Sequence, residues 1–274
     1  MDASRTSVDE RETKATGTQL LDRAVAILNY LGEVGRGGVR ASEIAETFEL
    51  NMSTAHRIIA GLERHQYVER IPGTKYYRLG LALFALGAKA ADTTGLRRVC
   101  HPVLMRLAAQ TGDTVFLMAR AGFNTVCVDR QEGTYIIDSL TGHVGGQIPL
   151  GVGSASQEIL AHLPAGEVSV VLETNGSLYP RYNGLTAGEI EASLPAIRRQ
   201  GYAVDHSHLV EGISALAVPI LLESGEVAGS IAINMTSARL KPKREKTLVG
   251  LLKDEISALQ SVLRPTDLAP SGAM

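Results

Sequence analysis

The chain has 274 residues, 45% of them hydrophobic, and a formal net charge of −2. Its length allows one large or two ordinary domains with a sizeable core. No apolar run reaches the roughly 18 residues that cross a bilayer, so we expect no membrane contact. Residues 1–17 are polar and lack the apolar segment of a secretory signal, so we predict a disordered tail on a cytoplasmic protein.

Residues 18–34 begin the first domain as a helix that ends at a Gly-rich turn. A short helix follows at 41–48, and a second begins at Ser53, a good N-cap. In the helix at 18–34, the apolar residues expected to face inward are Leu21, Ala24, Val25, Leu28 and Leu31. The stripe expected in the third helix is Ala55, Ile58, Ile59 and Leu62.

Two short strands are predicted at 67–70 and 76–79, with a turn of residues 71–75 between them. Three helices followed by a β-hairpin make a winged helix-turn-helix, which we assign to residues 18–80. Its partner would be double-stranded operator DNA. The residues that we expect to face DNA are Arg40, Ser42, Ser53, Thr54, His56 and Arg57, together with Lys75 and Arg78 on the wing. An ordinary amphipathic helix pair, or a winged helix used to bind protein, would show the same stripes.

Charge is divided unevenly along the chain. Residues 18–90 hold nine Lys and Arg against seven Asp and Glu, whereas residues 91–274 hold fifteen against eighteen. A surplus of two positive charges gives limited affinity for phosphates. Tight binding would need several linked modules, so we predict a homo-oligomer. The helical pattern at 81–94, with Leu83, Leu86 and Ala90, would be a linker helix that packs on a partner chain, or the last core helix of the first domain.

Residues 95–264 are predicted to form a second domain, followed by a tail at 265–274. Hairpin-paired strands alternate with helices without strict βαβ order, so the fold class is α+β with an antiparallel sheet. The expected helices are 96–111, 155–163, 185–200 and 247–263. The expected strands are 114–120, 125–130, 134–140, 216–222 and 227–235, with a Gly-rich loop at 141–153. The cysteines, Cys100 and Cys127, lie far apart in apolar segments and suit buried free thiols better than a disulfide or metal site.

The chain resembles the IclR family of bacterial transcription regulators over roughly residues 18–264. Order and spacing carry the resemblance, through 21–28, 53–57 and 77–80 in the first domain and 149–150, 201–205, 211–213 and 217–219 in the second. It implies a GAF-like effector-binding domain and dimers or dimers of dimers. It also implies that a small-molecule carboxylate binds the backbone N–H groups of Ser154 and Ala155, near Asp205.

The sequence departs from family members that sense two- or three-carbon acids. Those members carry a Cys and two Ser at the positions of Ala215, Ala232 and Asn234, so two polar groups are methyl groups here. A buried polar group without a partner costs roughly 1–3 kcal/mol, so we expect an acid with an apolar body. The alternative is a pocket filled by its own side chains. We expect the protein to repress transcription and not to activate it.

Other functions leave weaker traces. The loop Gly151-Val152-Gly153-Ser154-Ala155-Ser156 is one Gly short of a dinucleotide-binding fingerprint, and no parallel βαβ unit surrounds it, so nucleotide binding is only weakly indicated. The alternative is the start of an ordinary helix with a Ser N-cap. A metabolic enzyme with an anion site at this loop is the main alternative, although no motif for a catalytic nucleophile or a phosphate loop accompanies it. His206 and His208 beside Asp205 could bind a metal, but the pattern is weak, and we predict no metal and no cofactor.

Overall fold

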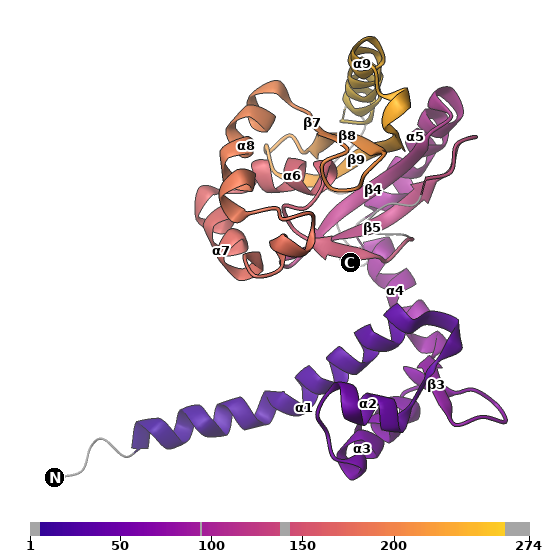
Figure 1. The fold of residues 1–274 in the computed structure, drawn as a ribbon, viewed down its shortest axis with the longest axis vertical. Coiled ribbons are helices and arrows are strands. Elements are labelled where there is room, and N and C mark those ends of the chain that lie inside the picture. Colours follow the sequence, from indigo (N-terminus) through magenta and orange to yellow (C-terminus); the bar gives the residue numbers. More distant parts are fainter. Residues whose placement is uncertain (1–5, 94, 138–142, 261–274) are drawn as a thin grey trace, which may run out of the picture. The chain divides into compact units, whose positions relative to one another are not determined.

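The computed structural model describes residues 6–93, 95–137 and 143–260, which divide into two compact units at residues 90 and 91. Each unit is described by itself (Figure 1). The predicted tails lie in part outside these residues, as do residues 138–142. None of the described helices is both long and apolar enough to cross a membrane.

The first unit is a winged helix-turn-helix, as predicted. Its small sheet is antiparallel with strand order β1-β3-β2, and the two outer strands both pair with β3. Its core gathers Ile27, Leu31, Ile44 and Ile59. The elements are α1 (Thr6–Val34), η1 (Gly35–Gly37), β1 (Val39–Arg40), α2 (Ala41–Thr47), α3 (Met52–Arg64), β2 (Val68–Arg70), β3 (Tyr76–Leu79) and α4 (Leu81–Thr93), the last crossing into the second unit.

Helix α1 differs from its prediction at its start and on its buried face. It begins at Thr6, where we expected a tail, because residues 6–17 are mostly polar and show no apolar stripe in the sequence. The fully buried pair is Ile27 and Leu31, whereas Leu21 and Val25 are 63% and 47% exposed. The buried face is therefore rotated about the helix axis from the predicted face, and the two faces share Leu31.

The N-cap of helix α3 lies two residues before the predicted one. Asn51, not Ser53, is the N-cap, and its side-chain oxygen accepts the backbone N–H of Thr54 at 2.8 Å. Asn and Ser are about equally good caps, so residue type alone could not choose between them. The predicted stripe of Ala55, Ile58, Ile59 and Leu62 is buried.

The second unit is a six-stranded antiparallel sheet between two layers of helices, with strand order β6-β5-β4-β9-β8-β7. One core lies between the sheet and α6, α7 and α8, and the other between the sheet and α5 and α9 (Figure 1). The helices are α5 (Leu96–Thr111), α6 (Ser154–Ala161), α7 (Ala165–Asn175), η2 (Tyr179–Arg181), α8 (Ala187–Gln200), η3 (Ser237–Arg239) and α9 (Pro242–Gln260). The strands are β4 (Thr114–Ala121), β5 (Asn124–Gln131), β6 (Gln147–Pro149), β7 (Ala203–His206), β8 (Ile213–Leu221) and β9 (Val227–Thr236).

Three sequence predictions for this unit were wrong in detail. The strand expected at 134–140 is irregular over its described residues 134–137. The loop expected at 141–153 contains edge strand β6, which is too short to show an alternating pattern. Helix α7 was not predicted, because it follows a proline and its polar and apolar residues are poorly segregated.

A buried carboxylate ties the end of the second unit to its beginning. Asp113 is fully buried, and Arg239 Nε and Arg244 Nη2 donate to its two oxygens at 2.7 and 2.6 Å. Both arginines also donate to the backbone oxygen of Thr111, at 3.2 and 3.0 Å. The two cations offset the cost of burying the carboxylate.

Candidate DNA-binding face and effector pocket

The outer face of α3 is suited to a DNA groove. Ser53, His56 and Arg57 are exposed and Thr54 is half-buried, on the side opposite the buried stripe. The Ser53 hydroxyl donates to the Asn51 side chain at 2.8 Å, so one of its hydrogen-bonding positions is already used. Small residues and one long cation on an exposed helix face allow close approach to base edges and phosphates.

Arg40 and Ser42 lie at the start of α2, and both are exposed. The Arg40 guanidinium lies 4.9 Å from the centre of the Tyr76 ring on the neighbouring strand. Stacking on an aromatic ring restrains the arginine without neutralising it. Arg40 therefore presents its charge beside the wing.

The wing places its cations differently from the prediction. Arg78 Nε donates to Glu69 Oε1 at 2.7 Å across the hairpin, so this charge is paired. Arg70, which was not predicted, donates from Nε to the backbone oxygen of Thr74 at 2.7 Å. Within the described ranges no carboxylate pairs with Arg70, so its outward nitrogens are available to phosphate. Lys75 is exposed at the turn, as expected.

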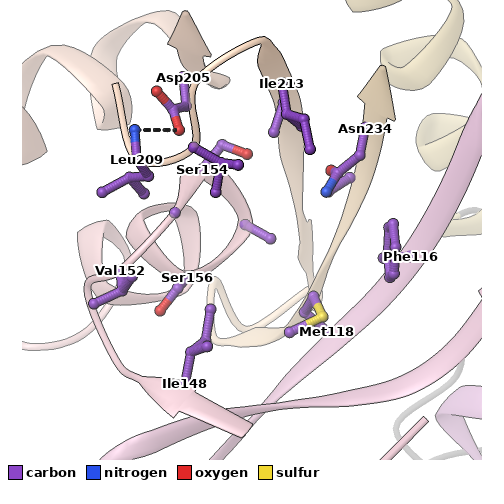
Figure 2. Close-up of a pocket in the computed structure, with 15 residues that line it drawn as sticks. Phe116, Met118, Ile148, Val152, Ser154, Ser156, Asp205, Leu209, Ile213 and Asn234 are labelled. Carbon is purple, nitrogen blue, oxygen red and sulfur yellow. Dashed lines mark hydrogen bonds between the residues drawn. The ribbon is translucent and has the colours of Figure 1, made fainter. Parts of the chain in front are cut away.

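A pocket in the second unit opens between the sheet and the start of α6 (Figure 2). All six residues predicted for effector binding line it, namely Ser154, Ala155, Asp205, Ala215, Ala232 and Asn234. Most of the remaining wall is apolar, formed by Phe116, Met118, Ile148, Val152, Leu209, Val210 and Ile213. Such a lining favours a ligand with an apolar body and few polar groups.

Among the described residues, no hydrogen-bond partner is found for the backbone N–H groups of Ser154 and Ala155, which begin α6 and line this pocket. The N-cap of α6 is Gly153, with φ of 80°, which has no side chain to accept the first N–H groups of the helix. Those N–H groups belong to Ser154 and Ala155, and helix ends leave them without internal partners. A carboxylate placed there would accept both and would also be favoured by the helix dipole.

Ser156, which also lines the pocket, holds the loop before α6. Its hydroxyl lies 2.7 Å from the Thr125 hydroxyl and accepts the backbone N–H of Gly151 at 2.8 Å. Ser156 and Thr125 are both fully buried. Gly151 has φ of 107°, a backbone conformation that L side chains rarely adopt. The network fixes the loop that presents the α6 donors.

Asp205 is engaged with its own chain. Its two oxygens accept the backbone N–H groups of His208 and Leu209, at 2.8 and 3.3 Å, and Figure 2 shows the contact with Leu209. Asp205 therefore fixes the loop that brings Leu209 and Val210 over the pocket. The residues that can be described contain no cluster of three metal-binding side chains, so the weak metal pattern around His206 and His208 gains no support.

Asn234 and the two alanines lie on the central strands. Ala215 on β8 pairs with Asn234 on β9, and Ala232 pairs with Phe116 on one side and Ala217 on the other. Asn234 lies across the pocket from Ser154 (Figure 2). The pocket therefore has backbone donors at one side, one amide at the other and methyl groups and Phe116 between them.

Both units match domains of known proteins. The domain described as "IclR helix-turn-helix domain" matches residues 20–72, and that described as "Bacterial transcriptional regulator IclR C-terminal" matches residues 88–260. The HTH-type transcriptional repressor AllR of Klebsiella pneumoniae is 28% identical over 90% of this chain and 90% of its own. The crystal structure of the Thermotoga maritima IclR has a TM-score of 0.66 and 27% identity, over 88% of this chain and 97% of its own. The crystal structure of an IclR homologue from Microbacterium hydrocarbonoxydans, complexed with 4-hydroxybenzoate, has a TM-score of 0.73 and 22% identity, over 91% of this chain and 99% of its own.

Proposed function

Because the chain belongs to the IclR family of bacterial transcriptional regulators, we propose that it represses transcription and that a partly apolar carboxylic acid controls its operator binding. The family and the relatives are DNA-binding transcriptional regulators, not enzymes, so the metabolic-enzyme alternative is set aside. Repression is proposed because AllR, a relative over nine-tenths of the chain, is a repressor.

One observation supports this effector class, namely the apolar pocket that the start of α6 helps to line. A carboxylate would accept the N–H groups of Ser154 and Ala155. Asn234 would meet a hydroxyl or a second polar group, because both oxygens of Asp205 already accept backbone N–H groups. The methyl groups of Ala215 and Ala232 would contact the ligand's apolar body and offer a small hydrophilic acid no hydrogen bond.

The test is a thermal-shift and calorimetric panel of 4-hydroxybenzoate, benzoate, phthalate, glyoxylate and pyruvate. The fold neighbour complexed with 4-hydroxybenzoate makes that acid the first compound to try. A ligand at about 100 times its Kd stabilises the folded state by about 2.7 kcal/mol, which a melting curve resolves. Preferential binding of glyoxylate or pyruvate would contradict the role given to Ala215 and Ala232. No response to any acid would favour a pocket filled by its own side chains.

Assembly as a homo-oligomer is part of the same proposal. Leu81, Phe84 and Leu86 on α4 are 77%, 73% and 48% exposed in the single chain. Exposed apolar side chains gathered on one helix are characteristic of a contact surface. We assign α4 to a second copy of the chain, because the small positive surplus of residues 18–90 calls for two linked DNA-binding units.

A further inference from the structure

Glu158 is a buried acid in the helix that begins at the effector pocket. It is fully buried, and neither of its carboxyl oxygens has a hydrogen-bond partner among the described residues. It lies four residues after Ser154 in α6, so the two side chains share one face of the helix, about 5–6 Å apart at Cβ. Glu158 itself does not line the pocket, and its carboxyl lies beside His162, one turn further along α6.

The surroundings of Glu158 supply little compensating charge. The side-chain nitrogen His162 Nδ1 lies 3.6 Å from Glu158 Oε2 and also 2.9 Å from the Glu158 backbone oxygen. Strands β8 and β9, which pack against α6, carry no titratable side chain. From α9, Lys253 acts only at longer range and donates its own hydrogen bond to the backbone oxygen of Gln200 at 2.8 Å.

The other elements packed on α6 hold their charges elsewhere. On α8, Arg198 donates to the backbone oxygens of Ala161 and Leu163, and the remaining charged residues are exposed. On β4, Arg120 pairs with Glu167. On β7, Asp205 accepts two backbone N–H groups, and exposed His206 lies 3.4 Å from Glu245. Neither oxygen of the buried Glu158 carboxyl has a hydrogen-bond partner among the described residues, and ionising a buried group in that situation is costly, so the neutral form is favoured.

Burial raises the pKa of Glu158 to about 8, and the charge of Lys253 lowers it only in part. The two buried thiols do not titrate in the same range, because burial raises the pKa of Cys100 to about 12 and that of Cys127 to about 11. Near neutral pH, Glu158 is therefore mostly uncharged and becomes charged in mildly alkaline solution.

We infer that the proton on Glu158 sets the charge preference of the effector pocket. The neutral side chain leaves the α6 donors open to a carboxylate, whereas the ionised side chain repels a second negative charge one helical turn away. The inference rests on the proposed carboxylate effector. By linkage, a bound carboxylate must also strengthen proton binding at Glu158, because the coupling between two sites is reciprocal.

The experiment compares benzoate with benzamide, which have similar shape but differ in charge. Calorimetry would give both dissociation constants from about pH 6.5 to about pH 9.5 for the wild-type protein, Glu158→Gln and the exposed control Glu191→Gln. For the wild type and the control, benzoate affinity should fall about tenfold or more across this range, as expected for two charges within about 12 Å of each other at an effective dielectric constant of about 20. Benzamide affinity should stay level, and Glu158→Gln should bind benzoate equally across the range.

The outcomes separate the inference from the proposed function. A level benzoate affinity in the wild type, or an equal fall in Glu158→Gln, would overturn the role of Glu158 and leave the effector class intact. No benzoate binding at any pH would overturn both. The wild type also gives a test that needs no variant, which is calorimetry in two buffers of different ionisation enthalpy. Benzoate binding should take up protons at about pH 8 and none at about pH 6.5, and equal uptake at both would refute the inference.

Discussion

Arg70→Gln should weaken DNA binding through the loss of a phosphate contact on the wing. Arg70 uses Nε to hold the turn and keeps its outward nitrogens free, whereas Arg78 is tied to Glu69. Each phosphate contact contributes about 0.9 to the slope of log affinity against log salt. For two copies on one duplex the slope should fall by about 1.8, so the loss of affinity should be about 12-fold larger at about 50 mM than at about 200 mM salt.

Fluorescence anisotropy with a labelled duplex of arbitrary sequence and about 30 base pairs measures this slope without knowledge of the operator. The matched control is the double variant Glu69→Gln with Arg78→Gln, which removes an ion pair and leaves the net charge unchanged. We expect the control to keep the wild-type slope. If the double variant lowers the slope as Arg70→Gln does, Arg78 leaves Glu69 to contact phosphate and the assignment to Arg70 is wrong.

Four further outcomes test the remaining assignments. Arg57→Ala should cost about 1–3 kcal/mol of operator affinity and relax specificity at one position if Arg57 contacts a base, and an unchanged affinity would remove it from the interface. Leu86→Glu should weaken operator binding far more than it destabilises residues 91–274, and a monomer in sedimentation that still binds tightly would contradict the role of α4. Replacing both Ala215 and Ala232 with Ser should shift thermal stabilisation from benzoate toward glyoxylate, because two hydroxyls return to the pocket. In urea unfolding, the free energy of unfolding of Glu158→Gln should exceed that of the wild type by an amount that grows from about pH 4.5 to about pH 8 and reaches at most about 5 kcal/mol. The reason is that the pKa of Glu158 is raised in the folded protein, so the wild type loses stability as pH rises through this window; a difference that stays constant with pH would rule this out.

Periodicity predicted the elements whose two faces differ strongly. Helix α3 was found because its apolar positions recur at helical spacing and its other face is polar, and the pair β8 and β9 because two apolar strands flank a clear turn. Helix α7 and strand β6 escaped, since one has no marked apolar face and the other has only three residues. Both features depend on packing partners that lie far away in the sequence.

The candidate sites were predictable to different depths. The positions of the pocket residues followed from the family resemblance, and the structure brings all six to one cavity. The engagement of Asp205 with backbone N–H groups depends on the path of its loop, which a sequence does not show. The pairing of Arg78 with Glu69 depends on the observed register, because counting outward from the predicted turn of residues 71–75 would place Glu69 opposite Tyr77. The burial of Glu158 could not be predicted from the sequence, since glutamate in a helix is ordinarily solvated.

The buried carboxylate at Asp113 has a consequence for the order of events during synthesis. Its two arginines lie more than 120 residues downstream, and β4 must wait for β9 as its central partner. A ribosome therefore releases residues 1–90 as a unit that can already fold, while the sheet of the second unit remains incomplete until η3 and α9 have emerged. During that interval β4 has an open edge and Asp113 lacks its two cations, and both features favour aggregation of an incomplete chain.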